Sequence, residues 1–224
     1  MRLVFDIETD GLLQDLTKIH CIVLINLDDG VKYKFGPKDY KRGLQMLKNA
    51  DEIWGHNIVG YDLEAIRKVH PNWEFKGKPY DTLILSRLFF TDLLDRDFRS
   101  KPANMPGNLY GRHSLEACGH RLGVHKSEFG KQLDGDWSTY TPEMLEYCAQ
   151  DVVVSVEVAK MFEPKLEQYA DCIDTEHRLA TIMSWQEREG FPFDVTAAQQ
   201  LESKLRTELD ALSDQMRSTF LFVD

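Results

Sequence analysis

The sequence predicts an α/β domain followed by a pair of amphipathic helices. Up to about residue 164, short apolar runs bounded by turn residues alternate with stretches in which apolar residues recur every three or four positions. This alternation is typical of successive strands and helices in an α/β domain. Beyond Pro164 only helical patterns remain. Because 224 residues suffice for one sizeable domain and part of another, we expect a first domain over residues 1–172 and a helical segment over 173–224.

Short runs rich in β-branched or aromatic residues predict the strands. Strands are expected over residues 2–7, 20–25, 31–35 and 53–56. An Asp-Asp-Gly turn at residues 28–30 predicts that the second and third strands form a hairpin.

Helical spacing defines the remaining elements. Helices are expected over residues 39–47, 61–69, 81–90, 113–122, 141–162, 174–189 and 194–216. Asp81 is a plausible N-cap of its helix, and Thr141 followed by Pro142 is a strong helix start.

Two regions depart from this regular pattern. Residues 91–112 mix Pro, Gly and Asn with basic side chains and predict a long loop, whose charges either contact phosphates or are simply solvated. The last helix has an apolar stripe that must pack on the first domain or on another partner, and the apolar tail "FLFVD" should be buried as well. The stripe consists of Ala198, Leu201, Leu205, Leu209, Leu212 and Met216.

Composition restricts the possible functions. A formal net charge of −10 argues against a nucleic-acid binder that relies on basic residues alone, although it permits an enzyme whose carboxylates are neutralised by metal. The four cysteines are scattered, which argues against a zinc site or a disulfide framework and favours a reducing cytoplasm. No apolar stretch is long enough to predict a membrane-spanning helix.

The first candidate functional residues are Asp6 and Glu8 in "FDIETDG". Positions i and i+2 of a strand point to the same face, so the two carboxylates lie side by side. Such a pair is costly in a poorly hydrated place unless a proton or a cation lies between them. Alternatively, the strand ends here and both groups are solvated.

Two more carboxylates also lie at the end or edge of a predicted apolar element. Asp62 opens a predicted helix after "HNIVGY", where it is either a functional group or a helix cap. Asp151 interrupts an apolar helical run, with Tyr147 one turn before it on the same face. Asp151 is therefore expected at the edge of the core, the alternative being a surface position.

Together these four carboxylates form an all-oxygen donor set. Oxygen donors without His or Cys suit Mg²⁺ or Mn²⁺ rather than zinc. We therefore predict that Asp6, Glu8, Asp62 and Asp151 hold two such ions, an arrangement suited to phosphoryl displacement.

The order of these motifs carries a resemblance. Asp-x-Glu, Asn-x-x-x-Tyr-Asp and Tyr-x-x-x-Asp resemble the three exonuclease motifs of the DEDD superfamily. Members of that superfamily are 3′–5′ exonucleases with an RNase-H-like (DnaQ-like) fold, in which helices flank a mixed sheet. Tyr147 stands four residues before Asp151, and Glu146 occupies the position of the histidine in the alternative subtype, so the chain resembles the tyrosine subtype (DEDDy).

Further segments resemble a narrower group. The stretches "DTLILSRL", "HSLEACGHRLG", "YCAQDVVV" and "EREGFPFD" are similar to the amino-terminal proofreading domain of family-A DNA polymerases from short-tailed phages of the T-seven type. The resemblance runs from residue 1 to about 215 and includes helices that lead into the polymerase thumb. It leaves no room for palm and fingers, so no polymerase activity is expected from this chain alone. It implies a DNA polymerase domain, or a separate polymerase chain, as partner. The loop at 91–112 and a short linker at 164–173 depart from the family pattern.

The resemblance also implies roles for individual residues. Asp6, Glu8 and Asp151 would hold the first metal, Asp6 would bridge to the second, and Asp62 would contact the second through water. Tyr147 would orient the attacking water. The 3′ end of single-stranded DNA would contact the substrate-binding residues, which are Thr9, Leu12, Asn57 and Tyr61, with Leu12 as a wedge between the terminal bases.

The function expected from this resemblance is a metal-dependent 3′–5′ DNA exonuclease that proofreads and releases nucleoside 5′-monophosphates. Two alternatives stay open at this point. One is a free-standing RNA 3′ exonuclease, and the other is a non-catalytic interaction subunit of a split DNA polymerase.

Overall fold

The computed structural model describes residues 1–124 and 137–220. The chain divides into two compact units, Met1–Trp185 and Gln186–Asp224. Among the described residues, no helix is long and apolar enough to cross a membrane.

The first unit is built on one mixed five-stranded sheet with the strand order β3-β2-β1-β4-β5. Its strands are β1 (Arg2–Thr9), β2 (Ile19–Asn26), β3 (Lys32–Phe35), β4 (Glu52–Gly55) and β5 (Lys78–Asp81). The first three strands pair antiparallel, whereas β1, β4 and β5 run parallel to one another. The central strand β1 is therefore paired on both sides, which makes it a rigid support for the side chains that it carries.

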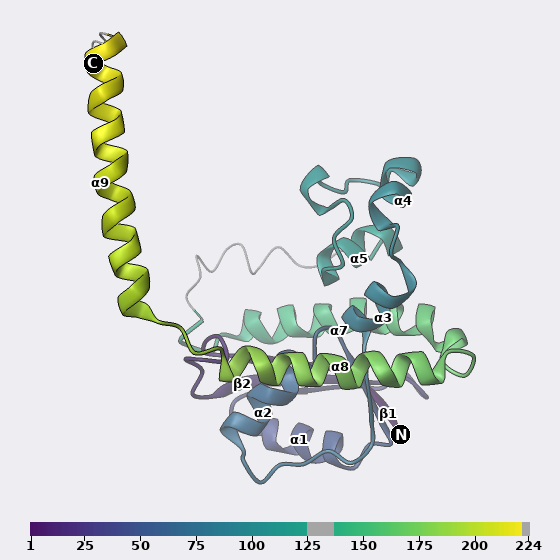
Figure 1. Cartoon of the computed structure of the whole chain (residues 1–224). Helices are drawn as coiled ribbons and strands as arrows, with labels where there is room; N and C mark the ends of the chain where they lie inside the picture. The colour runs from purple at the N-terminus through teal and green to yellow at the C-terminus, as the bar shows by residue number, and fades with distance from the viewer. Residues whose placement is uncertain (125–136, 221–224) are drawn as a thin grey trace. The chain divides into compact units, whose positions relative to one another are not determined.

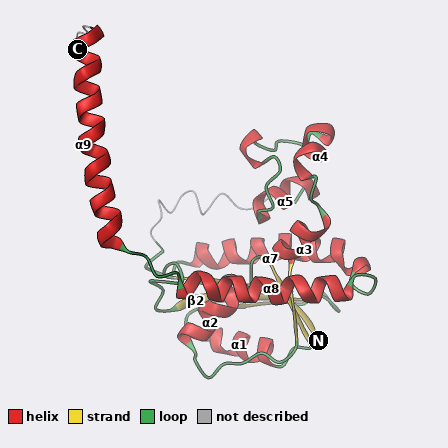
Figure 2. Ribbon diagram, in the orientation of Figure 1, coloured by secondary structure: helices red, strands yellow, loops and turns green. Residues whose placement is uncertain are grey.

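Helices cover both faces of this sheet (Figures 1 and 2). Helices α1 (Tyr40–Lys48) and α2 (Asp62–Val69) pack on one face, over a core that includes Phe5 and Ile53. Helices α3 (Thr82–Phe89), α5 (Leu115–Leu122) and α7 (Pro142–Phe162) cover the other face, over a core that includes Val4 and Trp54. The mixed α/β sheet flanked by helices that the sequence predicts is thus observed.

Most predicted elements lie within a few residues of their observed positions, but β5 was missed. Its sequence, Lys-Pro-Tyr-Asp, contains Pro79, which lacks the amide hydrogen that a central strand needs. Because β5 lies at the edge of the sheet, the proline is tolerated there.

The prediction of a loop over residues 91–112 was also wrong in part. That stretch contains helix α4 (Leu93–Ser100) and the short 3₁₀ helix η1 (Gly107–Leu109). Asp97 of α4 is buried and forms two hydrogen bonds to the Arg121 guanidinium of α5, at 2.9 and 2.7 Å. This long-range ion pair stabilises a helix that the local composition does not indicate.

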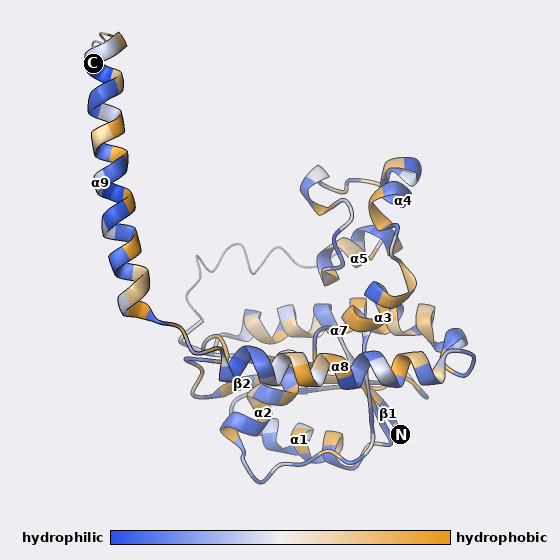
Figure 3. Cartoon of the chain, viewed as in Figure 1, coloured by the Kyte–Doolittle hydropathy of each residue, from blue (hydrophilic) through white to orange (hydrophobic). Residues whose placement is uncertain are grey.

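The last helices are longer than predicted. After a short 3₁₀ helix, η2 (Glu163–Lys165), helix α8 spans Ala170–Glu189 and buries Ile173 and His177 in the first unit. Helix α9 (Val195–Phe220) belongs to the second unit, where polar and apolar residues alternate along it (Figure 3). Among the described residues of the second unit, none covers the apolar stripe of α9, and no residue of this helix is buried. The tail at 221–224 lies outside the described residues.

Candidate metal and nucleic-acid site

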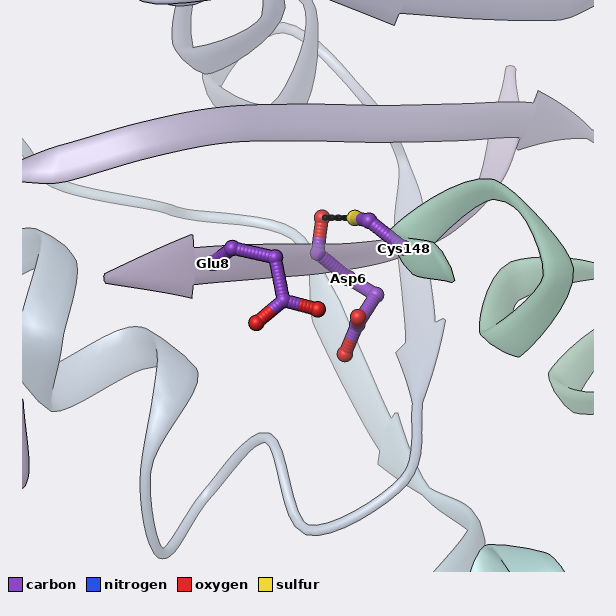
Figure 4. Close-up of side chains that lie close together, drawn as sticks. All are labelled: Asp6, Glu8 and Cys148. Atoms are coloured by element: carbon purple, nitrogen blue, oxygen red, sulfur yellow. Dashed lines mark hydrogen bonds between the residues drawn. The ribbon is translucent and has the colours of Figure 1, made fainter. Parts of the chain in front are cut away.

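Strand β1 places Asp6 and Glu8 on the face of the sheet that α7 covers. Within β1, Leu3, Phe5 and Ile7 point into one core, whereas Val4 points into the other, on the side of Asp6 and Glu8. Figure 4 shows the two carboxylates extending to the same side of the strand. One ligand atom from each of Asp6, Glu8 and Cys148 lies within 4.8 Å of the others.

The electrostatics of this pair favour a bound cation. Burial, together with the Asp6 carboxylate, raises the pKa of Glu8 well above its ordinary value. A divalent cation between the two groups would remove the repulsion and replace the lost hydration.

Cys148 of α7 lies beside the pair but has the chemistry of a supporting group. Its thiol donates a hydrogen bond to the Asp6 carbonyl oxygen at 3.3 Å, drawn as the dashed line in Figure 4. Burial raises the pKa of this thiol well above its usual range, which favours the neutral form over the thiolate that binds metal. The contact therefore ties α7 to β1 directly behind Asp6.

Asp62 reaches the site from the loop that follows β4. The end of β4 lies so close to β1 that a Cβ on Gly55 would be 2.8 Å from the Phe5 carbonyl oxygen, so only glycine fits there. Asp62 is the first residue of α2 and only 3% exposed, and its Oδ1 atom has no hydrogen-bond partner among the residues that the structure describes. Burial and the nearby carboxylates of Asp6 and Asp81 raise its pKa well above the ordinary value. A buried carboxylate with one oxygen left without a donor, close to other carboxylates, fits a cation ligand.

Helix α7 supplies Tyr147 and Asp151. Thr141 caps this helix by accepting a hydrogen bond from the Met144 amide, and the valines around Asp151 pack on the sheet. Asp151 is 5% exposed, whereas Tyr147, one turn earlier, is half-buried and lies edge-on to the ring of Trp137. The helical period thus points both side chains into one opening.

All nine residues predicted for the site line a single cleft of about 1080 Å³. They are Asp6, Glu8, Thr9, Leu12, Asn57, Tyr61, Asp62, Tyr147 and Asp151. Three segments that are distant in sequence therefore converge on one opening.

The four predicted substrate-binding residues form one wall of the cleft. Tyr61 and Thr9 donate hydrogen bonds from their hydroxyls to the Gly11 carbonyl, at 2.7 and 2.9 Å, and also contact each other. These bonds hold the turn that presents Leu12, whose side chain is 75% exposed. Asn57 is exposed nearby with a φ of 66°, in the left-handed region. An apolar side chain held out in a polar cleft has no role in the core and suits contact with a nucleobase.

The opposite side of the cleft contains residues that the sequence reasoning did not assign. Arg87, Arg112, His113 and Trp137 all line it. Arg112 belongs to the predicted basic loop, and two other basic residues of that loop, Arg96 and Arg99, instead pair with Asp92. Neither Arg87 nor Arg112 forms an ion pair with a described residue, which leaves both charges available for an anion. No local pattern could have found Arg87 or Trp137, because only tertiary packing brings α3 and the segment before α7 to this cleft.

Comparison with known proteins agrees with this geometry. No protein-family model matches the chain. The DNA-directed DNA polymerases of Enterobacteria phage T3 and Escherichia phage T7 are 33% and 31% identical to it, over 97% of this chain and 37% of each polymerase. The chain thus spans little more than a third of the length of these relatives.

Solved structures share the fold. Brucella melitensis NrnC bound to pGG superposes with a TM-score of 0.57 at 19% identity, over 87% of this chain and 88% of that chain. Escherichia coli RNase D, an exoribonuclease involved in structured RNA processing, superposes with a TM-score of 0.52 at 17% identity, over 82% of this chain and 44% of that chain. A structure of NrnC with bound Mg²⁺ matches similarly, with a TM-score of 0.56 at 18% identity. The chain is therefore a relative of the T3 and T7 DNA polymerases, similar to a part of them over nearly its whole length, and it has the RNase-H-like exonuclease fold.

Proposed function

We propose that this chain is a metal-dependent 3′–5′ DNA exonuclease that proofreads for a DNA polymerase. The observation that carries the proposal is the convergence of Asp6, Glu8, Asp62 and Asp151 on one cleft, with Tyr147 beside them. A structural cluster would place donors around such carboxylates, whereas here Asp62 has a buried oxygen without one.

The carboxylates would hold two Mg²⁺ or Mn²⁺ ions. Asp6, Glu8, Asp62 and Asp151, which line one cleft, would together hold these ions. When bound, such ions supply a hydroxide and neutralise the charge that develops on the phosphate. All four groups are carboxylates, and this donor chemistry suits either cation.

The protein's own side chains would position the strand and the water. Tyr147 would hold the attacking water by a hydrogen bond, because a phenol with an ordinary pKa of about 10 is a poor base at neutral pH. Leu12 would separate the last two bases, with Asn57 and Tyr61 against the terminal nucleotide. Cleavage of the last phosphodiester would release a nucleoside 5′-monophosphate and leave a 3′-hydroxyl on the shortened strand.

Arg87 and Arg112 would bind phosphates on the other side of the cleft. Both line it and have no carboxylate partner among the described residues. They offset, locally, the net charge of −10 that repels a polyanion. The overall charge still predicts weak intrinsic affinity for DNA, which low salt and a polymerase partner should improve.

A DNA substrate is favoured over RNA by the strength of the similarities. The relatives at 31–33% identity are DNA polymerases, whereas RNase D shares the fold at only 17% identity. The similarity to part of a polymerase also favours a polymerase domain or a separate polymerase chain as partner.

The decisive experiment uses 5′-labelled single-stranded DNA and RNA oligomers of one sequence. The protein is incubated with each in Mg²⁺, in Mn²⁺ and in EDTA, beside a variant with Asp6→Ala and Glu8→Ala. We expect a DNA ladder that shortens from the 3′ end only with metal and only with the unaltered pair. Faster degradation of RNA would favour the ribonuclease alternative. No cleavage by folded protein, together with stable binding to a polymerase chain, would favour a scaffold.

A further inference from the structure

Helix α8 satisfies a backbone group at the open edge of the sheet. The Asp81 amide, at the end of the edge strand β5, donates a hydrogen bond to Nε2 of His177 at 2.8 Å. Both residues are buried, with exposures of 1% and 7%. A buried edge amide requires an acceptor, and His177 provides it.

The protonation of His177 is determined by its second hydrogen bond. Its Nδ1 lies 2.8 Å from the Ile173 carbonyl oxygen, which can only accept a hydrogen bond. The ring proton is therefore on Nδ1, and Nε2 accepts the hydrogen bond from the Asp81 amide. The ring also meets Tyr80 edge-on, with centroids 6.3 Å apart. The imidazole is therefore fixed in both orientation and tautomer.

Asp81 connects this contact to the loop that precedes Asp62, one of the carboxylates proposed above to hold the metal ions. Its carboxylate accepts hydrogen bonds from the amides of Asn57 and Val59, both at 2.9 Å, and from the amide of Leu83 at 2.9 Å. The first two amides belong to the loop between β4 and α2. Two amide bonds to one buried carboxylate therefore hold that loop in place, shortly before Asp62.

We propose that His177 is a positioning residue for the cleft, acting through Asp81 on the loop of residues 56–61. It holds the Asp81 backbone, the Asp81 carboxylate holds the loop, and the loop places Asn57, Tyr61 and Asp62. The proposal rests on the function proposed above for the cleft. It also makes this wall of the cleft depend on α8, the helix that continues past Trp185 into the second unit.

Three substitutions separate positioning from a merely structural role. His177→Phe keeps an aromatic ring but removes the acceptor. His177→Gln restores an acceptor at the position of Nε2. Ile173→Ala is the matched control, because Ile173 is 1% exposed and anchors α8 by packing, without a side-chain contact to Asp81.

The first measurement is amide hydrogen exchange of the metal-free proteins. We expect His177→Phe to speed the exchange of the Asn57 and Val59 amides by about tenfold, since the hydrogen-bonded frame behind them is lost. His177→Gln should restore most of the protection. Ile173→Ala should speed exchange in α8. The exchange rates of the Asn57 and Val59 amides should stay close to those in the unaltered protein.

The second measurement is the Mg²⁺ dependence of DNA cleavage. His177→Phe should raise the Mg²⁺ concentration that gives half of the maximal rate by about tenfold, because a displaced ligand weakens binding more than it blocks chemistry. His177→Gln should return it towards the original value.

Two results would overturn the proposal. One is unchanged exchange at Asn57 and Val59 in His177→Phe. The other is the same exchange pattern and Mg²⁺ shift in Ile173→Ala as in His177→Phe at an equal loss of Tm. If the unaltered protein degrades no nucleic acid, the proposed function fails, while the exchange measurement still decides the role of His177.

Discussion

Replacing Asp62 by asparagine should stabilise the metal-free protein while it abolishes nuclease activity. Asp62 is buried, its Oδ1 lacks a donor among the described residues, and the Asp6 and Asp81 carboxylates lie near it. In EDTA the repulsion and the lost hydration destabilise the charged form of this group, and the backbone amides of Asp62 and Ile7 offset only part of that cost. An amide of the same shape removes the charge and adds a donor that can face either neighbouring carboxylate.

The magnitude follows from the burial and the size of the first unit. A buried charged group with one oxygen left without a donor costs about 1–3 kcal/mol, so its replacement should recover a similar free energy of unfolding. The compact unit has 185 residues, Met1–Trp185. For a unit of that size, each kcal/mol shifts Tm by about 2–4 °C, so Asp62→Asn should raise Tm in EDTA by about 2–12 °C.

Asp81→Asn is the matched control, with the opposite sign. Burial raises the pKa of the Asp81 carboxyl as well, but three backbone amides donate to it and oppose this rise. The side-chain amide of an asparagine at this position would direct its own N–H groups towards one of the backbone amides that donate to Asp81. The free energy of unfolding should therefore fall by about 1–3 kcal/mol.

The assay is thermal unfolding followed by circular dichroism near pH 8, in EDTA and then in Mg²⁺. Mg²⁺ should raise the Tm of the unaltered protein by more than it raises the Tm of Asp62→Asn. The difference in Tm between the two proteins should therefore shrink or change sign. If the Tm of Asp62→Asn in EDTA is equal to or lower than the Tm of the unaltered protein, the inference that the Asp62 charge destabilises the metal-free protein is refuted.

Four further predictions concern other residues. Burial and a neighbouring carboxylate raise the pKa of Glu8, so the folded metal-free protein binds that proton more tightly than the unfolded chain. Its free energy of unfolding in urea should therefore fall as pH rises above about 4.3 towards the raised pKa, and saturating Mg²⁺ should remove this fall. The Arg121 guanidinium lowers the pKa of Asp97, so this pair's contribution should be complete at pH 7 and be lost as pH falls below about 4 through the lowered pKa; Asp97→Asn should abolish that part of the acid sensitivity. Tyr147→Phe should reduce kcat by about tenfold or more with little change in KM, because it removes a hydrogen bond to the water and not to the strand; an unchanged kcat would exclude that role. Leu12→Ala should mainly raise KM in steady-state cleavage of single-stranded DNA without changing Tm, and an unchanged KM would exclude a role of Leu12 in binding the strand.

The parts of the site that depend on local periodicity could be predicted from the sequence. Asp6 and Glu8 share a face because strand residues alternate, and Tyr147 and Asp151 share a face because helical residues recur every turn. Asp81 was predicted as a helix cap, and its side chain does accept from the Leu83 amide. The catalytic and metal-binding roles of Asp6, Glu8, Tyr147 and Asp151 stay predictions, since the geometry shows only that these residues share a cleft.

Other features depend on contacts between distant segments. Helix α4 was predicted as a loop because the ion pair between Asp97 and Arg121 joins residues 24 positions apart. Only the packing of α7 on β1 shows that the Cys148 thiol contacts the Asp6 carbonyl oxygen.

The sequence by itself determined most of the strands and helices, though not β5 or α4, as well as the four carboxylates and the class of cation that they suit, because these follow from local period and side-chain chemistry. Only the tertiary structure decided which buried carboxylate keeps an oxygen without a donor and which accepts from three amides. Asp62 and Asp81 are the same residue type at neighbouring helix starts, yet the amides of Asn57, Val59 and Leu83 all donate to Asp81, whereas Oδ1 of Asp62 has no partner among the described residues. The free energy of a buried charge depends on such partners, and chain segments distant in sequence supply them.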